Sequence, residues 1–189
     1  MFVNVYEPSD DTWLLISSLE KLRGEKYSVC LDLGSGTGIV GIFLLKNNIC
    51  ERVFFIDINE YALENTLYNL IYNNLLGRGI IINNYNGNCF GENMFDLVIS
   101  NPPYLPGVPK DLYDKALLSG PSGFETIIDF IDSVSKIIKP GGLFFLVYSS
   151  LSNPHVIEEY LSMKGFSIIN KLSKHFFFED IIVVEAVKK

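Results

Sequence analysis

The motif Asn101-Pro102-Pro103-Tyr104 follows directly after the apolar run FDLVIS, and its residue types suit the binding of a planar nitrogen group. An asparagine amide both donates and accepts hydrogen bonds, so it can pair edge to edge with another amide or a ring amine. Pro102 and Pro103 have no N–H to donate, which leaves stiff backbone carbonyls as acceptors. Tyr104 could lie against the target or near a cation. An amide nitrogen is a poor nucleophile, so such a site would act by positioning it, an effect worth roughly 7 kcal/mol.

The alternative for this motif is purely structural. Two prolines end a strand well, and Tyr104 could simply pack in a core. The motif occurs, however, in a chain that also carries the glycine-rich stretch DLGSGTG, and the two together favour a functional site.

The stretch DLGSGTG runs from Asp32 to Gly38, between a strand candidate and a helical run. Gly34, Gly36 and Gly38 would let the backbone turn sharply and approach a ligand. The following helix would offer its free N–H groups to the same ligand. The stretch therefore predicts a ligand-binding loop.

Three features favour S-adenosylmethionine, a methyl donor, as the ligand of this loop. Asp32 lies two residues before the first glycine, where its carboxylate could meet the donor's ammonium group. Asp57 ends the next strand candidate and could accept hydrogen bonds from both ribose hydroxyls. Gly36, Gly38 and Gly41 also fit the dinucleotide pattern GxGxxG, but the asparagine-proline motif has no role in hydride transfer.

Apolar runs typical of strands alternate with helical patterns, which predicts a parallel sheet with helices on both faces. The candidate strands are 27–33, 52–57, 79–85, 95–100, 142–148, 166–172 and 180–187, and the candidate helices are 10–22, 39–47, 60–74, 123–138 and 154–164. Residues 139–142 read as a turn before a strand. The last two strands are joined by a short connection that suits an antiparallel hairpin. We expect a Rossmann-like α/β fold with a mostly parallel seven-stranded sheet, in one domain over residues 1–189.

The composition restricts the possible partners. The chain of 189 residues carries 15 basic and 22 acidic residues, a formal net charge of −7, and its basic residues are scattered. Direct binding to nucleic acid is therefore not expected. No segment resembles a secretion signal or a membrane span, and three cysteines without a CxxC pattern fit a reducing compartment. We expect a cytoplasmic protein without a bound metal.

The motifs together resemble those of class I methyltransferases, and more closely those of the HemK-like protein glutamine N5-methyltransferases. DLGSGTG looks like the donor loop of that family, FFIDIN like its ribose-binding strand end, and ISNPPY like the segment that holds the target glutamine. VYEPSDDTWLL resembles the YEPxEDT segment of the archaeal and eukaryotic branch, which lacks the additional N-terminal domain of the bacterial enzymes.

The resemblance implies further site residues. Thr12 would lie beside the donor, with residues 1–26 forming an N-terminal segment and helix that cover the donor site. From the residues alone, Ser9 and Asp10 could equally cap a helix. At the place where the family has an acidic residue for the adenine amino group, this chain reads NGNCFGE. Asn88 would then accept that hydrogen bond, and Cys89 would line the adenine.

The resemblance also implies an activity and a partner. The activity is methylation of the glutamine in the GGQ motif of a class 1 translation release factor. The partner is a small zinc-binding activator subunit, added at the edge strand 79–85 to form a heterodimer. Two alternatives remain open at this point: an N-methyltransferase for an exocyclic base nitrogen, and a non-catalytic subunit that keeps a donor-binding fold.

Overall fold

A seven-stranded sheet forms the centre of the protein, as seen in a computed structural model that describes residues 4–111 and 113–189. The strand order is β3-β2-β1-β4-β5-β7-β6, and the first five strands are parallel. β7 runs antiparallel between β5 and β6. The strands are β1 (Tyr27–Leu33), β2 (Cys50–Asp57), β3 (Gly79–Asn83), β4 (Phe95–Ser100), β5 (Ile138–Ser149), β6 (Phe166–Phe176) and β7 (Glu179–Lys188).

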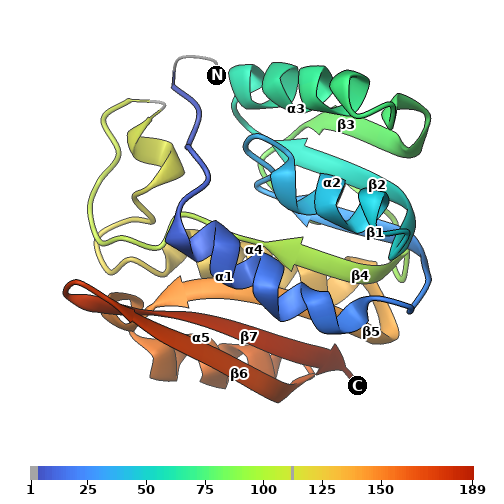
Figure 1. Cartoon of the computed structure of the whole chain (residues 1–189). Coiled ribbons are helices and arrows are strands. Elements are labelled where there is room, and N and C mark those ends of the chain that lie inside the picture. Colours follow the sequence, from blue (N-terminus) through green and yellow to red (C-terminus); the bar gives the residue numbers. More distant parts are fainter. Residues whose placement is uncertain (1–3, 112) are drawn as a thin grey trace.

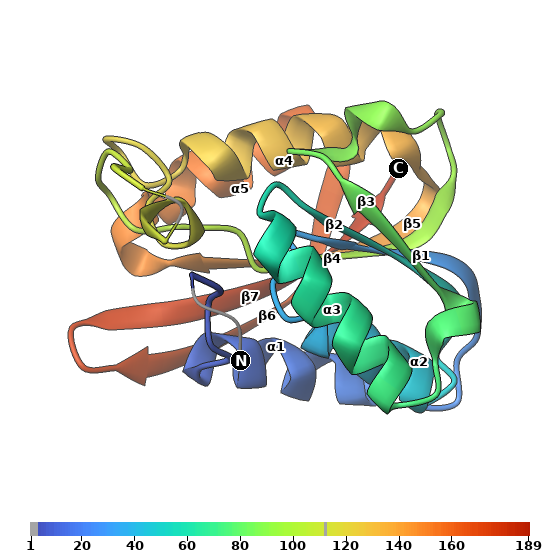
Figure 2. The ribbon, with the colours of Figure 1, turned by 90° about the horizontal axis from the view of Figure 1, so that it is seen from above.

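Helices cover both faces of this sheet, as the sequence predicted (Figures 1 and 2). The helices α1 (Asp10–Leu19), α2 (Ile39–Lys46) and α3 (Glu60–Tyr72) lie on one face, and α4 (Glu125–Ile137) and α5 (Pro154–Met163) lie on the other. Local chemistry fixes their starts. The Asn59 side chain accepts a hydrogen bond from Tyr61 N before α3. Pro154 occupies the first turn of α5, where its missing N–H costs nothing.

Two separate cores lie between the sheet and its helices. In β4, Leu97 and Ile99 pack on the side of α1 and α2, while Val98 packs on the side of α4 and α5. This alternation follows from the two-residue period of a strand, and burial on both sides is typical of parallel sheets. Burying such a side chain contributes roughly 1.5–3 kcal/mol. The two cores therefore hold the strand ends, and the loops that follow them, in fixed positions.

The Rossmann-like fold and its C-terminal antiparallel strands are confirmed, and the departures are local. β5 begins at Ile138, because the segment predicted as a turn instead forms an irregularity within the strand, with Gly141 at φ +79°. β6 continues to Phe176, beyond its predicted end. Cys30 and Cys50 form a disulfide between β1 and β2, which departs from the expectation drawn from the odd cysteine count. Among the described residues, no helix is long and apolar enough to cross a membrane.

Candidate donor and acceptor site

The loops that follow β1, β2 and β4 meet at the carboxyl edge of the sheet, the usual ligand position in such folds. A cavity of about 290 Å³ opens there, near the lower end of the roughly 300–1,000 Å³ of small-molecule sites. Of the residues predicted from the sequence, its lining includes Thr12, Asp32, Gly34, Gly36, Asp57, Asn101 and Pro103. A second cavity of about 30 Å³ is lined by Asn101, Pro102, Pro103 and Tyr104, among others.

Asp57 fixes the glycine loop to the end of β2. One oxygen of its carboxylate, Oδ2, accepts a hydrogen bond of 2.8 Å from Gly36 N, and the other, Oδ1, accepts one of 2.9 Å from Asn59 N. On the far side of the loop, Thr66 Oγ1 donates to the Gly36 carbonyl at 3.0 Å. The loop is thus held between β2 and α3. Burial raises the pKa of Asp57, and the backbone hydrogen bonds oppose that shift.

Asp32 forms part of the cavity wall and is only 3% exposed. Its Oδ2 atom accepts a hydrogen bond of 2.8 Å from Gly41 N. Burial raises its pKa to about 8, against the lowering effect of that hydrogen bond, and the nearby Asp57 adds to the rise. A carboxylate in this position gains from any cation that enters the cavity, because a cation removes the cost of ionising a buried acid.

Gly38 differs from the other glycines of the loop because it does not line the cavity. It precedes α2 with φ +74°, and a Cβ atom there would lie 2.8 Å from two atoms of Thr66. Both the left-handed backbone and the close approach of α3 require glycine. The structure therefore gives Gly38 a role in loop geometry, and it does not bring it to the ligand cavity as the sequence predicted.

The smaller cavity is organised around Asp11, a residue that the sequence analysis does not assign to the site. Asp11 is 4% exposed, and its Oδ2 atom accepts hydrogen bonds of 3.0 Å from Asn101 Nδ2, Tyr104 OH and Tyr6 OH. Burial raises the pKa values of both tyrosines, and the charge of Asp11 raises them further, so the two phenols remain donors. The N-terminal segment thereby sets the orientation of the Asn101 amide.

Asn101 Oδ1 is buried and has no hydrogen-bond partner within the described part of the chain. The only other such side-chain atom there is Ser35 Oγ, in the glycine loop. The Asp11 carboxylate can only accept hydrogen bonds, so the Nδ2 end of the Asn101 side chain must face it. The Oδ1 end then remains as an acceptor beside both cavities. An unpaired buried acceptor is costly, so this atom favours a ligand that brings an N–H.

The rest of the motif is held rigidly. The Tyr104 carbonyl accepts a hydrogen bond of 2.6 Å from Ser152 Oγ, which ties the motif to the segment after β5. The Tyr104 ring packs against both cores, so the structural role considered for it holds together with its position at the smaller cavity. Pro102 and Pro103 lie between these anchors, and both reach a cavity wall.

Thr12 lies at the cavity and also takes part in the start of a helix, the two roles considered for its segment. Its side chain lines the larger cavity, and its Oγ1 atom accepts a hydrogen bond of 3.4 Å from Ser9 N at the start of α1. Tyr6 and Pro8 line the same cavity, and Asn59 Nδ2 holds the segment by donating to the Asn4 carbonyl at 2.7 Å. The N-terminal segment therefore closes one side of the cavity.

The structure does not bring Asn88 and Cys89 to the cavity. Both side chains are exposed, because the turn at 87–89 packs its Gly87 backbone tightly on Ile137 of α4 and so directs its neighbours outward. Tyr85 and Ile58 line that part of the cavity in their place. Ile58 lies within the stretch FFIDIN, of which only Asp57 was predicted to bind a ligand, and Tyr85 belongs to no motif.

Comparisons with known proteins agree with this geometry. The family described as "Methyltransferase small domain" matches residues 8–174. "Methyltransferase HEMK2" of Homo sapiens is 31% identical, and the alignment covers 99% of this chain and 91% of that protein. "Putative protein N5-glutamine methyltransferase MJ0928" of Methanocaldococcus jannaschii is 29% identical, with 96% of this chain and 91% of that protein covered.

A solved structure extends the likeness to three dimensions. It is the E. cuniculi Mtq2-Trm112 complex, described as responsible for methylation of the eRF1 translation termination factor. It matches with a TM-score of 0.76 and 25% identity, over 99% of this chain and 100% of that chain. The family match spans most of the sequence, and the fold and the glycine loop agree with it. The chain belongs to the methyltransferase small domain family.

Proposed function

We propose that the chain transfers a methyl group from S-adenosylmethionine to the side-chain amide nitrogen of the glutamine in the GGQ motif of a class 1 release factor. The observation that supports a glutamine amide as the methyl acceptor is the arrangement of the Asn101 side chain. Its Nδ2 atom is fixed by Asp11, while its Oδ1 atom stays unpaired beside both cavities. A glutamine side-chain amide supplies the N–H donor that this atom lacks.

The cavity suits the donor on two grounds. Asp32 is a buried acid that gains from a cation, and the donor carries an ammonium group. Asp57 lies at the end of β2 on the cavity wall, in the usual place for a ribose-binding acid. Thr12, Gly34 and Gly36 would complete the donor contacts. The donor supplies an electrophilic methyl group, and the residues of this chain orient it.

The acceptor amide would be held by the motif after β4. Asn101 Oδ1 would accept one of its N–H hydrogens, and the Pro102 carbonyl could accept the second, since neither proline offers a competing donor. Tyr104 would close the smaller cavity beside the target, with its phenol held on Asp11. The rate gain comes from holding the weakly nucleophilic amide nitrogen in line with the methyl group of the donor, and this positioning does not depend on a strong base.

The choice of glutamine over a base nitrogen rests on the relatives and on charge. A relative named as a protein N5-glutamine methyltransferase covers almost the whole chain. The net charge of −7 disfavours a nucleic acid acceptor, which is itself a polyanion. A release factor acts in the cytoplasm, so we infer the same compartment for this enzyme.

We also propose a small zinc-binding partner subunit. Its support is the E. cuniculi complex, in which the similar chain is paired with Trm112. β3 forms one edge of the sheet, as predicted for this partner's strand, and its apolar residues Ile80, Ile81 and Ile82 are only partly covered. A partner strand would satisfy the free backbone groups of that edge.

The test uses labelled donor and either a release factor containing GGQ or bulk nucleic acid, with and without a candidate small zinc protein. The expected result is label in the release factor only, at the glutamine, and none in a factor with that glutamine replaced by leucine. Label in nucleic acid alone would refute the proposal and support base methylation. Label in neither substrate, with donor bound normally, would support a non-catalytic subunit.

The role of the motif has its own control. Asn101→Ala should abolish transfer to the factor while leaving donor affinity within a few-fold of the original value. Asn170→Ala is the matched change, because Asn170 is an exposed asparagine on β6. Full activity in Asn101→Ala would show that the amide does not hold the acceptor.

A further inference from the structure

The tip of the β6–β7 hairpin is formed by Phe177 and Phe178, which join the two strands as a two-residue turn. Their side chains are 89% and 94% exposed, the highest values among the exposed large apolar residues of the described chain. Exposed apolar side chains in direct sequence are uncommon on soluble proteins unless they contact a partner.

The turn is also an unfavourable place for phenylalanine. Phe177 adopts φ +51°, a left-handed conformation that asparagine or glycine adopts more easily. The first position of a two-residue hairpin turn with positive φ is usually glycine, asparagine or aspartate. Neither side chain is buried, so the pair gives the fold no apolar core in return for this backbone. Residues that break a local rule without a gain in folding are typical of functional positions.

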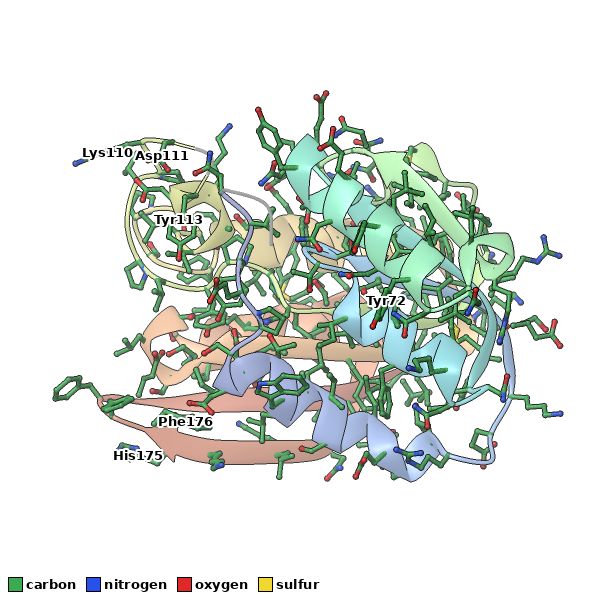
Figure 3. The ribbon with its side chains drawn as sticks, turned by 45° about the horizontal axis from the view of Figure 1, so that its top comes forward. Tyr72, Lys110, Asp111, Tyr113, His175 and Phe176 are labelled. Carbon is green, nitrogen blue, oxygen red and sulfur yellow. A yellow bond between two sulfur atoms is a disulfide. The ribbon has the colours of Figure 1, made fainter. Side chains whose placement is uncertain are left out.

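The tip lies at the carboxyl edge of the sheet, the edge at which the two cavities lie. β5 ends at Ser149, whose partner is Ile181, so the pairs His175–Asp180 and Phe176–Glu179 extend beyond the end of β5. Figure 1 shows the hairpin projecting past the sheet on the same side as the loop after β4. Figure 3 places Phe176 and His175 at this projection.

Hydrogen bonds connect the tip to the acceptor motif. Ser149 Oγ donates to the Glu179 carboxylate, and Asp180 N donates to Ser150 Oγ at 3.0 Å. Two residues further along the same segment, Ser152 Oγ donates to the Tyr104 carbonyl. The base of the tip and Tyr104 are therefore held by the same short segment, 149–152.

The flanks of the tip carry charges of both signs, with Glu179 and Asp180 on β7 opposite the basic end of β6. Lys171, Lys174 and His175 lie on the last part of β6, although the chain as a whole carries −7. Lys171 is paired with Glu158, and His175 lies 2.9 Å from Asp180. Lys174 forms no ion pair with any described residue, and its Nζ atom lies 4.9 Å from the centre of the Phe176 ring.

We propose that the hairpin tip docks the protein that carries the target glutamine. Phe177 and Phe178 would enter an apolar depression on that protein, and Lys174 would face acidic groups at its rim. The docking would hold the glutamine-bearing loop at the Asn101 motif. This inference rests on the proposed function, since it assigns a binding surface for the same protein substrate.

The test replaces both tip side chains by residues that the turn accommodates, Phe177→Asn together with Phe178→Gly. Asparagine adopts the positive φ of position 177 more easily than phenylalanine, and glycine adopts any φ at 178 at an entropic cost, so the variant should unfold within a few degrees of the original. Its KM for the intact release factor should rise at least about tenfold, the loss expected when an apolar anchor is removed from an interface. Its kcat, its donor affinity and its activity on a short GGQ peptide should not change.

Met163→Asn is the control. Met163 is another exposed apolar residue, and it lies at the end of α5, away from the carboxyl edge of the sheet. It should leave the KM unchanged. An unchanged KM in the Asn-Gly variant would overturn the docking role while leaving the proposed function intact. If the original chain methylates neither factor nor peptide, the proposed function itself has failed.

Two further measurements examine other occupants of the tip. Sedimentation of the original chain should show monomers. Dimers that disappear in the Asn-Gly variant would instead assign the tip to a second copy. Vesicles of anionic lipid should not retain the chain, and tip-dependent retention would likewise overturn the proposal.

Discussion

Asp11 is the residue on which the orientation of Asn101 depends. Its carboxylate collects donors from Asn101, Tyr104 and Tyr6, and all three approach the same oxygen at 3.0 Å. An amide in its place would present an N–H group to some of these donors. Asn101 would then lose the fixed direction of its Oδ1 atom, which is the proposed acceptor contact.

We therefore expect Asp11→Asn to lower kcat by about 100-fold, the size typical of losing one aligned polar contact in an active site. Donor affinity should change only a few-fold, because Asp11 does not line the larger cavity. Steady-state kinetics and donor titration measure the two effects separately. Asp10→Asn, an exposed neighbour in the same turn, is the control and should behave like the original chain. A normal kcat in Asp11→Asn would remove the positioning role.

Asp32 predicts a pH dependence of stability. Its folded pKa is raised to about 8 from an ordinary value of 3.8, mainly by burial. The folded protein therefore holds this proton more tightly than the unfolded chain. The stability that it contributes is fully present below about pH 4 and is lost as the pH rises to about 8, by up to about 1.4 kcal/mol per pH unit.

Urea unfolding of the ligand-free chain between pH 5 and 8 should show this loss, and Asp32→Asn should reduce it. The variant should be the more stable protein at pH 8, yet it should lose donor binding because it cannot become an anion. Glu64→Gln, a change of an exposed carboxylate on α3, provides the comparison at the same pH values. An equal slope in Asp32→Asn and the original chain would contradict the raised pKa.

The sequence predicted the site residues that belong to recognisable motifs, and it did not predict those that reach the site only through tertiary contacts. Asp32, Asp57 and Asn101 follow strands, so their position at one edge followed from the parallel sheet. Asp11 lies in a segment whose pattern indicates a helix start and, by resemblance, a donor contact of Thr12, and its partner Asn101 is 90 residues away. Contacts of this separation depend on how α1 packs, which no local pattern expresses.

At the scale of elements, the glycine loop and α3 determine each other's position. Gly38 can adopt φ +74° and leaves no room for a Cβ atom, which would meet Thr66 Cγ2 and Oγ1 at 2.8 Å. Thr66 in turn holds the Gly36 carbonyl. Thus the start of α2, the loop and α3 form one unit beside the larger cavity.

Gly38→Ala should accordingly destabilise the protein by about 1–3 kcal/mol, through the strained backbone and the clash with α3. Thr66→Ala removes the two clashing atoms, so the double variant should be more stable than the sum of the single changes predicts, as measured by urea unfolding in a double-mutant cycle. Gly77→Ala controls for the added methyl group, since nothing lies within 4 Å of a Cβ atom there and φ is not positive. Strict additivity would mean that Thr66 is not the obstacle.

Element types were predictable because strand and helix periods are strong, whereas element ends were less so. β1 and β4 begin and end at the predicted residues, since Lys26 and Gly34 flank β1 and the two prolines after Asn101 end β4. The start of β5 was missed because proline and glycine usually mark a turn, and here they form an irregularity inside a strand. The length of β6 depends on pairing with β7 across a two-residue turn, which extends exposed polar residues into a strand, and Phe177-Phe178 is not a sequence that signals such a turn.

For the molecule as a whole, net charge disfavours one of the two classes of acceptor that the motif after β4 cannot separate. An asparagine amide and proline carbonyls can hold a base nitrogen as well as a glutamine. The formal charge of −7, from 15 basic and 22 acidic residues, opposes any approach of a polyanion. The basic residues near the hairpin tip are few, and Lys171 among them is already paired with Glu158.

We therefore expect no retention of double-stranded DNA or of RNA by the chain at either 50 or 200 mM salt, with a dissociation constant weaker than roughly 10⁻⁴ M, the weak limit of ordinary non-specific binding. Fluorescence anisotropy with labelled oligonucleotides measures this directly, and the release factor serves as the competing ligand. Binding that weakens steeply with salt would reveal basic contacts that the charge distribution does not predict. It would then favour a base over glutamine, because nucleic acid binding of this kind depends on neutralised phosphates.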